Sequence, residues 1–209
     1  LGQQAFTPDG RGFRYCKAGA SALVPGRLKQ APAEDTTNWQ NLTVTAPTAG
    51  DTSVTTTTTV TLTANALAGG YLVIADGSAG EGQIARIKSH AAATAAVVTF
   101  QLEDPIKTTC TGTVKIDVFP NPYSGVVIAP TTATSGPIGV AIYAVAAGEY
   151  GWVQTHGPAA CLAQGTVTVG DDVVPANTTT TGTVVAKADA TIDAVVGYAL
   201  TGIADTEYG

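Results

Sequence analysis

Few residues in this chain have the types and spacing that catalysis requires. A nucleophile elbow needs Gly-x-Ser-x-Gly on a strand-to-helix turn, and the run Gly77-Ser78-Ala79-Gly80 lacks that spacing. The glycines from Gly77 to Gly82 are also not followed by the Lys-Ser/Thr pair with which a phosphate loop holds nucleotide and metal. We therefore interpret this run as a turn.

The histidines and acidic residues do not form a metal-ligand pattern. His90 and His156 lie in different parts of the chain, and neither has a second histidine two or four residues away. The best carboxylate clusters, Asp171-Asp172 and Asp189/Asp193, supply two groups each, whereas calcium takes about six oxygen ligands. We interpret Gly170-Asp171 as a hairpin turn. We expect no enzyme activity, no metal and no cofactor.

Three cysteines, Cys16, Cys110 and Cys161, cannot all pair within one chain, and no two of them have a metal-ligand spacing. We expect them to be small buried side chains in a protein of a reducing compartment. The longest apolar run, residues 138–147, spans about half of what a bilayer core needs, so no membrane partner is expected.

Charge is scarce and unevenly distributed. Only 12% of the residues are charged, against about 25% in typical soluble domains. A protein surface with so few charges favours oligomerisation, because an assembly can bury it. The net charge is −6, yet residues 1–33 alone carry +4. This basic start either lies on an acidic partner surface or folds back on the chain's own acidic C-terminal barrel. Its few basic residues are too thinly spread to favour nucleic acid as the partner.

The stretch from Tyr143 to Val185 alternates apolar and small polar residues in short runs separated by glycine. This pattern predicts strands joined by tight turns, at 149–154, 166–169, 173–174 and 183–185, and a β-barrel or sandwich over residues 121–209. In the first strand Tyr150 and Trp152 share one face, opposite Gly151 and Val153. Because aromatic rings bury large areas, we expect the face that carries Tyr150 and Trp152 to fill the core. The barrel-core candidates are Tyr150, Trp152, Leu162, Val167 and Val196.

Two sets of turn-and-strand motifs occur at the two ends of the chain. The first runs from Asp9 to Ala20 (DGRGFRYCKAGA) and continues to Leu23, Pro25 and Gly26. The second contains YGWVQTHGPA at 150–159, Leu162 with Gly165, Val169-Gly170-Asp171, Val174-Pro175, Gly182-Thr183-Val184 and Val196-Gly197-Tyr198-Ala199-Leu200. In this order the motifs, which cover about half the chain, resemble the capsid cement (decoration) proteins of tailed bacteriophages. They contain no catalytic fingerprint.

The middle of the chain, residues 34–120, predicts an inserted or second β-rich domain after a linker at 31–35. From Thr43 to Thr63, eleven of twenty-one residues are threonine, which favours a half-exposed strand or hairpin, with a disordered polar tract as the alternative. Further strands are predicted at 71–74, 83–88, 97–102 and 113–119, with a helical turn possible at 90–96. The predicted fold class is therefore all-β, with no helix longer than about three turns.

The resemblance implies a structural virion protein that binds the major capsid protein on the outer surface of a tailed-phage capsid, after assembly in the host cytoplasm. It would cement neighbouring capsomers without catalysing a reaction, and it would be a homotrimer. The basic N-terminal segment, residues 1–33, supplies the capsid-contact candidates, which are Arg11, Phe13, Arg14, Tyr15 and Lys17. The alternatives are a phage-tail or cell-surface adhesin, which predicts a concave aromatic patch, and a secreted hydrolase, which predicts a catalytic constellation.

Overall fold

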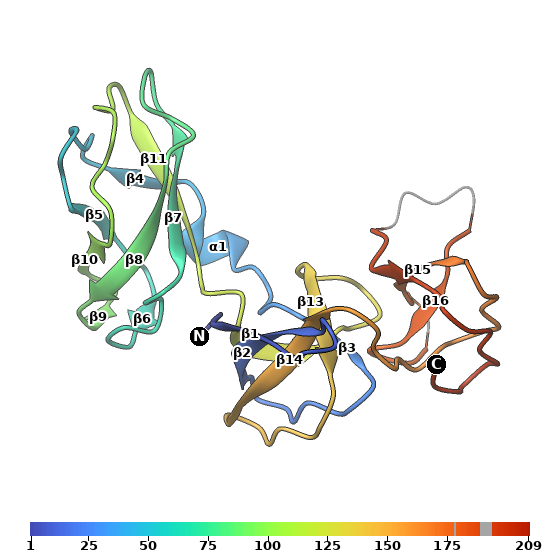
Figure 1. Cartoon of the computed structure of the whole chain (residues 1–209). Coiled ribbons are helices and arrows are strands. Elements are labelled where there is room, and N and C mark those ends of the chain that lie inside the picture. Colours follow the sequence, from blue (N-terminus) through green and yellow to red (C-terminus); the bar gives the residue numbers. More distant parts are fainter. Residues whose placement is uncertain (178, 189–193) are drawn as a thin grey trace. The chain divides into compact units, whose positions relative to one another are not determined.

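The computed structural model describes residues 1–177, 179–188 and 194–209, which divide into two compact units (Figure 1). The first unit contains residues 1–33 and 122–209, and the second contains residues 34–121. The second unit is thus an insertion into the first. The basic N-terminal segment belongs to the same unit as the C-terminal half of the chain.

The first unit is built on a closed barrel. Its strands are β1 (Gln4–Phe6), β2 (Gly12–Ala18), β3 (Leu28–Gln30), β12 (Ser124–Ile128), β13 (Pro137–Ala141) and β14 (Tyr150–His156). The sheet order is β1-β2-β12-β3-β13-β14, and β14 pairs again with β2, which closes the barrel. All pairs are antiparallel except β12 with β2. A closed sheet leaves no free edge except on β1, the hairpin strand added to β2.

Small and medium-sized side chains fill the barrel interior. The buried cluster contains Cys16, Ala18, Leu23, Val126, Ala141, Val145 and Val153. Space is tight beside β14, because a Cβ added to Gly151 would lie 2.4 Å from Cγ2 of Val145. The interior therefore cannot hold an aromatic ring at this position.

The expectation that Tyr150 and Trp152 fill the barrel core is wrong. Gly151 and Val153 point inward and are buried, whereas Tyr150 is 53% exposed and Trp152 is half-buried on the outer face. The predicted alternation is correct, but the opposite face is the inner one. A barrel with this few strands has a narrow interior, so the bulky rings lie outside.

The C-terminal part of the first unit forms a separate small sheet. Its strands are β15 (Asp172–Pro175), β16 (Val184–Ala186) and β17 (Gly197–Tyr198), in the order β16-β15-β17. Leu162 and Val167 are buried and Val196 is half-buried, as expected of core candidates. Val167 and Val196 pack in two small clusters outside the barrel interior, and Leu162 forms an isolated bridge with Tyr208. The strand predicted at 166–169 is only an isolated bridge between Val167 and Ile203.

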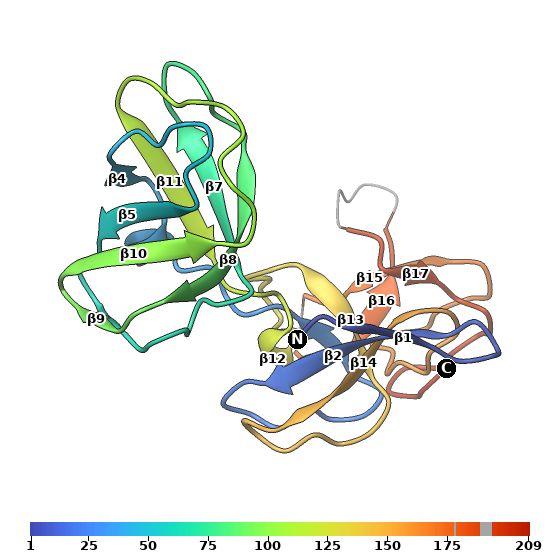
Figure 2. The same cartoon turned by 60° about the vertical axis from the view of Figure 1, so that its left-hand side comes forward.

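The second unit is a nearly closed barrel of its own (Figure 2). Its elements are α1 (Thr36–Trp39), β4 (Leu42–Val44), β5 (Ser53–Thr57), β6 (Thr61–Leu62), β7 (Tyr71–Asp76), β8 (Ile84–His90), β9 (Ala93–Thr94), β10 (Val97–Leu102) and β11 (Val114–Phe119). The sheet order is β4-β11-β7-β8-β10-β5, and β6 pairs with β9. Between the two edge strands, the Thr56 hydroxyl donates to the Thr43 carbonyl (3.1 Å).

The chain is nearly all β, which confirms the predicted fold class. Within the described residues the only helix is the four-residue α1. The threonine-rich segment is a half-exposed strand at 53–57, in which Thr56 faces the core and Thr55 and Thr57 face outward. The helical turn considered at 90–96 is absent, since β8 extends to His90 and β9 follows it.

Candidate interaction surface

The barrel closure brings two of the predicted contact residues beside two of the predicted core residues. In the β2–β14 ladder, Tyr15 lies opposite Trp152 and Lys17 lies opposite Tyr150. Directly opposed residues in an antiparallel pair point to the same face of the sheet. We refer to Tyr15, Lys17, Tyr150 and Trp152 as the aromatic face.

The rings of the aromatic face are packed against one another. Tyr15 and Tyr150 are stacked, with centroids 5.8 Å apart and an interplanar angle of 12°. Tyr15 and Trp152 have centroids 5.2 Å apart and are tilted by 57°. Nζ of Lys17 lies 5.5 Å from the centre of the Tyr150 ring, within cation–π range. These contacts fix the side chains before any partner arrives.

The loop between β13 and β14 contacts β14 through Tyr143. Its hydroxyl accepts a hydrogen bond from the backbone N–H of Trp152 (2.8 Å), and 41% of the residue is exposed. Two residues later Val145 is buried in the barrel and bridges to Leu23. The loop is therefore held to the barrel by the Tyr143 hydroxyl and by Val145.

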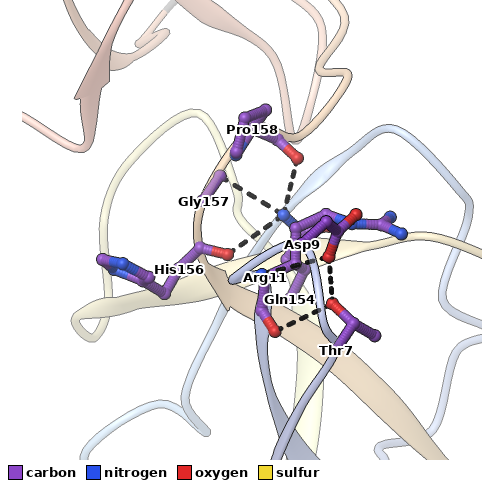
Figure 3. Close-up of polar contacts among 7 residues, drawn as sticks. All are labelled: Thr7, Asp9, Arg11, Gln154, His156, Gly157 and Pro158. Carbon is purple, nitrogen blue, oxygen red and sulfur yellow. Dashed lines mark hydrogen bonds and ion pairs between the residues drawn. The ribbon is translucent and has the colours of Figure 1, made fainter.

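The other three predicted contact residues lie outside the aromatic face and are engaged within the chain. Phe13 is buried, and the guanidinium of Arg11 lies 5.9 Å from the centre of its ring. Nε of Arg11 also donates to Oδ2 of Asp9 (2.8 Å; Figure 3). Arg14 is half-buried. Its Nη1 donates to the Gly2 carbonyl (2.8 Å), and its guanidinium lies 5.7 Å from the centre of the Tyr123 ring.

Gln154 supports this surface and was not singled out from the sequence. Its Nε2 lies within hydrogen-bond distance of three successive carbonyl oxygens, those of His156 (3.1 Å), Gly157 (3.2 Å) and Pro158 (2.7 Å), as Figure 3 shows. The residue is only 3% exposed. It thus ties the turn that follows β14 to the strand. The sequence signal that could have identified Gln154 is its position two residues after Trp152 and shortly before the Gly157-Pro158 turn.

The described residues do not assemble a group of metal-binding side chains. Across residues 1–177, 179–188 and 194–209, no group of three or more His, Cys, Asp or Glu side chains could hold a metal ion. Asp171 is used in a turn, where Oδ2 accepts from the backbone N–H of Thr168 (2.8 Å). Asp189 and Asp193 lie outside the described residues.

The three cysteines are free and buried, as expected. Burial raises the pKa of Cys16 to about 11. Burial also raises the pKa of Cys161 to about 11, against the opposing effects of backbone hydrogen bonds and nearby positive charge. These thiols therefore remain protonated at neutral pH, which does not suit a nucleophile.

No family model, curated protein or solved structure matches the chain. No helix within the described part of the chain is both long and apolar enough to cross a membrane.

Proposed function

We propose that this protein is a non-catalytic structural protein of the virion, which binds the outer surface of a tailed-phage capsid and cements neighbouring capsomers. The observation that carries the proposal is the aromatic face. It joins two strands from the two parts of the sequence that resemble cement proteins.

The composition of the aromatic face suits protein binding. Tyrosine and tryptophan are enriched among residues that dominate binding energy, because they bury large areas at low conformational cost. Lys17 adds one cation at the edge of the Tyr150 ring. A partner surface with an apolar pocket beside an acidic side chain would complement this arrangement. We propose that the major capsid protein supplies that surface.

The aromatic face lies on the barrel wall and not on a free arm. β2 pairs with β1, β12 and β14, so Tyr15 and Lys17 are held by the backbone ladder. A rigid surface loses little conformational entropy on binding. Such pre-organisation suits a protein whose activity is adhesion.

We also propose that the protein binds the capsid as a homotrimer. The low content of charged residues supports self-association, as do the exposed apolar side chains of Val169, Tyr198 and Leu200 in the C-terminal sheet region. Light scattering of the purified protein should give three times the mass of one chain. A monomer in solution that also decorates shells as isolated copies would contradict the trimer but not the capsid binding.

A receptor-binding adhesin is the second candidate, because exposed stacked rings can also bind sugar rings. The two functions are separated by sedimentation of the purified protein with phage heads and, in parallel, with host cells. The proposed function predicts stoichiometric co-sedimentation with heads that is weakened in Tyr150→Ala. Binding to cells without binding to heads would favour the adhesin.

A further inference from the structure

Arg27 and Lys29 form a pair of cations at β3 with no carboxylate beside them. Lys29 lies in β3 and Arg27 comes directly before this strand, and the charge of Arg27 acts on Lys29. The ion pairs of the described residues involve other cations, namely Arg11, Arg86 and Lys115. The lack of an acidic partner is notable in a chain with 16 acidic and 10 basic residues.

The guanidinium of Arg27 is only partly satisfied. Nη1 donates to the Thr181 carbonyl (2.6 Å). Nε is buried and has no hydrogen-bond partner, and it is the only such side-chain atom within the described residues. A buried donor without an acceptor is costly, and native structures rarely contain one. The edge of the guanidinium that contains Nε is also the edge that binds carboxylates and phosphates in bidentate fashion.

Lys29 adds a second positive charge. It is fully buried, and Nζ donates to the Val24 carbonyl (2.7 Å). Burial lowers the pKa of Lys29 to about 8; nearby Cys161 opposes this shift, and the charge of Arg27 adds to it. At neutral pH the amine still carries its proton. Burying a charge is unfavourable unless an opposite charge compensates it.

We propose that Arg27 and Lys29 form a binding site for a small oxyanion, which accepts a hydrogen bond from Nε of Arg27 and whose charge is stabilised by the buried ammonium of Lys29. The site lies where β3 meets two segments of the C-terminal part. The Leu162 N–H donates to the Gly26 carbonyl (2.9 Å), and the Leu28 N–H donates to the Gly182 carbonyl (2.8 Å). A bound oxyanion therefore stabilises the attachment of the C-terminal strands to the barrel. This inference does not depend on the aromatic face or on capsid binding.

Inorganic phosphate is the probe for the site. Isothermal titration of the whole protein at pH 7 and constant ionic strength should show one phosphate per chain. The melting temperature in phosphate should exceed that in sodium chloride of equal ionic strength by about 3 °C. Arg27→Gln should lose both effects. Arg86→Gln is the matched control, because Arg86 pairs with Glu103 in the second unit, and it should keep both.

Phosphate also stabilises proteins in general, because it is excluded from the protein surface. The comparison with Arg86→Gln separates this general effect from binding at the site. A temperature shift of equal size in wild type, Arg27→Gln and Arg86→Gln, without 1:1 binding, would overturn the proposal. If Arg27→Gln does not fold, the wild-type titration decides, and Lys29→Met should weaken phosphate binding about tenfold. Acetate in place of phosphate identifies the source: equal binding of both indicates a protein carboxylate, and binding of phosphate alone indicates a phosphate ligand.

Discussion

Tyr15 and Tyr150 stack across the β2–β14 ladder, although one lies near the start of the chain and the other follows the whole inserted unit. Their rings are nearly parallel, at 12°, and Trp152 leans against Tyr15 from the same strand as Tyr150. The closure of the barrel thus creates a surface that neither sequence segment has alone. That surface can be tested one side chain at a time.

Replacing Tyr150 by alanine should weaken binding to phage heads and leave the fold intact. The ring is more than half exposed, so its removal leaves no cavity in the core. As the most exposed ring of the aromatic face it should contribute about 2 kcal/mol to binding, or roughly thirtyfold in the dissociation constant. Head-binding assays and thermal melts measure the two effects separately.

Tyr198→Ala is the matched control for Tyr150→Ala. Tyr198 is 68% exposed in the same unit, but it lies on β17, away from the β2–β14 ladder. Because Tyr198 is also a candidate for self-association, light scattering must first show that the variant keeps the wild-type mass, and it should then bind heads as wild type does. Equal loss of binding in both variants at the wild-type mass would show that binding is not localised to the aromatic face.

Replacing Lys17 by glutamine should reduce head binding a few-fold and make it less sensitive to salt. Lys17 is partly exposed, and a charge at such a position contributes modestly to affinity but strongly to encounter and register. Salt screens such a charge beyond about 8 Å at physiological ionic strength. Arg11→Gln serves as the comparison, because Asp9 already compensates Arg11. The salt dependence of head binding should be the same in Arg11→Gln as in wild type. A larger change in Arg11→Gln than in Lys17→Gln would indicate that the β1–β2 hairpin makes the capsid contact.

Replacing Gln154 by alanine should lower the stability of the first unit by about 1–3 kcal/mol, because the carbonyls of residues 156–158 lose their shared donor. Chemical denaturation followed by a probe in that unit measures the change. Gln3→Ala, at an exposed glutamine of the same unit, should have little effect. Equal stability of the two variants would mean that water replaces the amide without loss.

The strand pattern could be predicted from the sequence, but the orientation of β14 could not. Alternation from Tyr150 to Val153 separates two faces and does not say which one is inside. Because large rings usually fill a core, the face with Tyr150 and Trp152 was expected to lie inside. The answer depends on Val145, which fills the space beside Gly151 and comes from a loop whose position no local pattern reveals.

The predicted capsid-contact residues also differ from one another in the structure, because long-range strand pairing decides which of them are buried. From the sequence, capsid contact was the predicted role of Arg11, Phe13, Arg14, Tyr15 and Lys17 alike. Phe13 is buried near the start of β2, where β1 pairs with it, whereas Tyr15 and Lys17 lie beside the aromatic residues of β14. Long-range pairing, which composition and spacing do not encode, divides one strand into a structural part and an accessible part.

The stability of the first unit should depend on pH through Lys29. Its pKa is about 8 in the folded chain, below its ordinary value of 10.5. Between these two values the unfolded chain binds more protons than the folded chain, so raising the pH through this window stabilises the fold. The charges nearest Lys29 are those of Arg27 and, once ionised, Cys161. Cys16 and Cys161 act with the opposite sign, because their raised pKa values remove stability as the pH rises from 9 to 11.

A comparison with Lys29→Met isolates the lysine, since the thiols are present in both proteins. Methionine fills a similar volume without a charge, so the variant should be more stable than wild type at pH 7 in a chloride buffer. The difference in melting temperature should shrink as the pH rises from 7 to 10, because wild-type Lys29 then loses its proton. A difference that stays constant over this range would mean that Lys29 titrates at the same pH in the folded and unfolded chains. The charge would then be solvated or compensated in the fold, which would contradict an anion site that depends on the buried charge of Lys29.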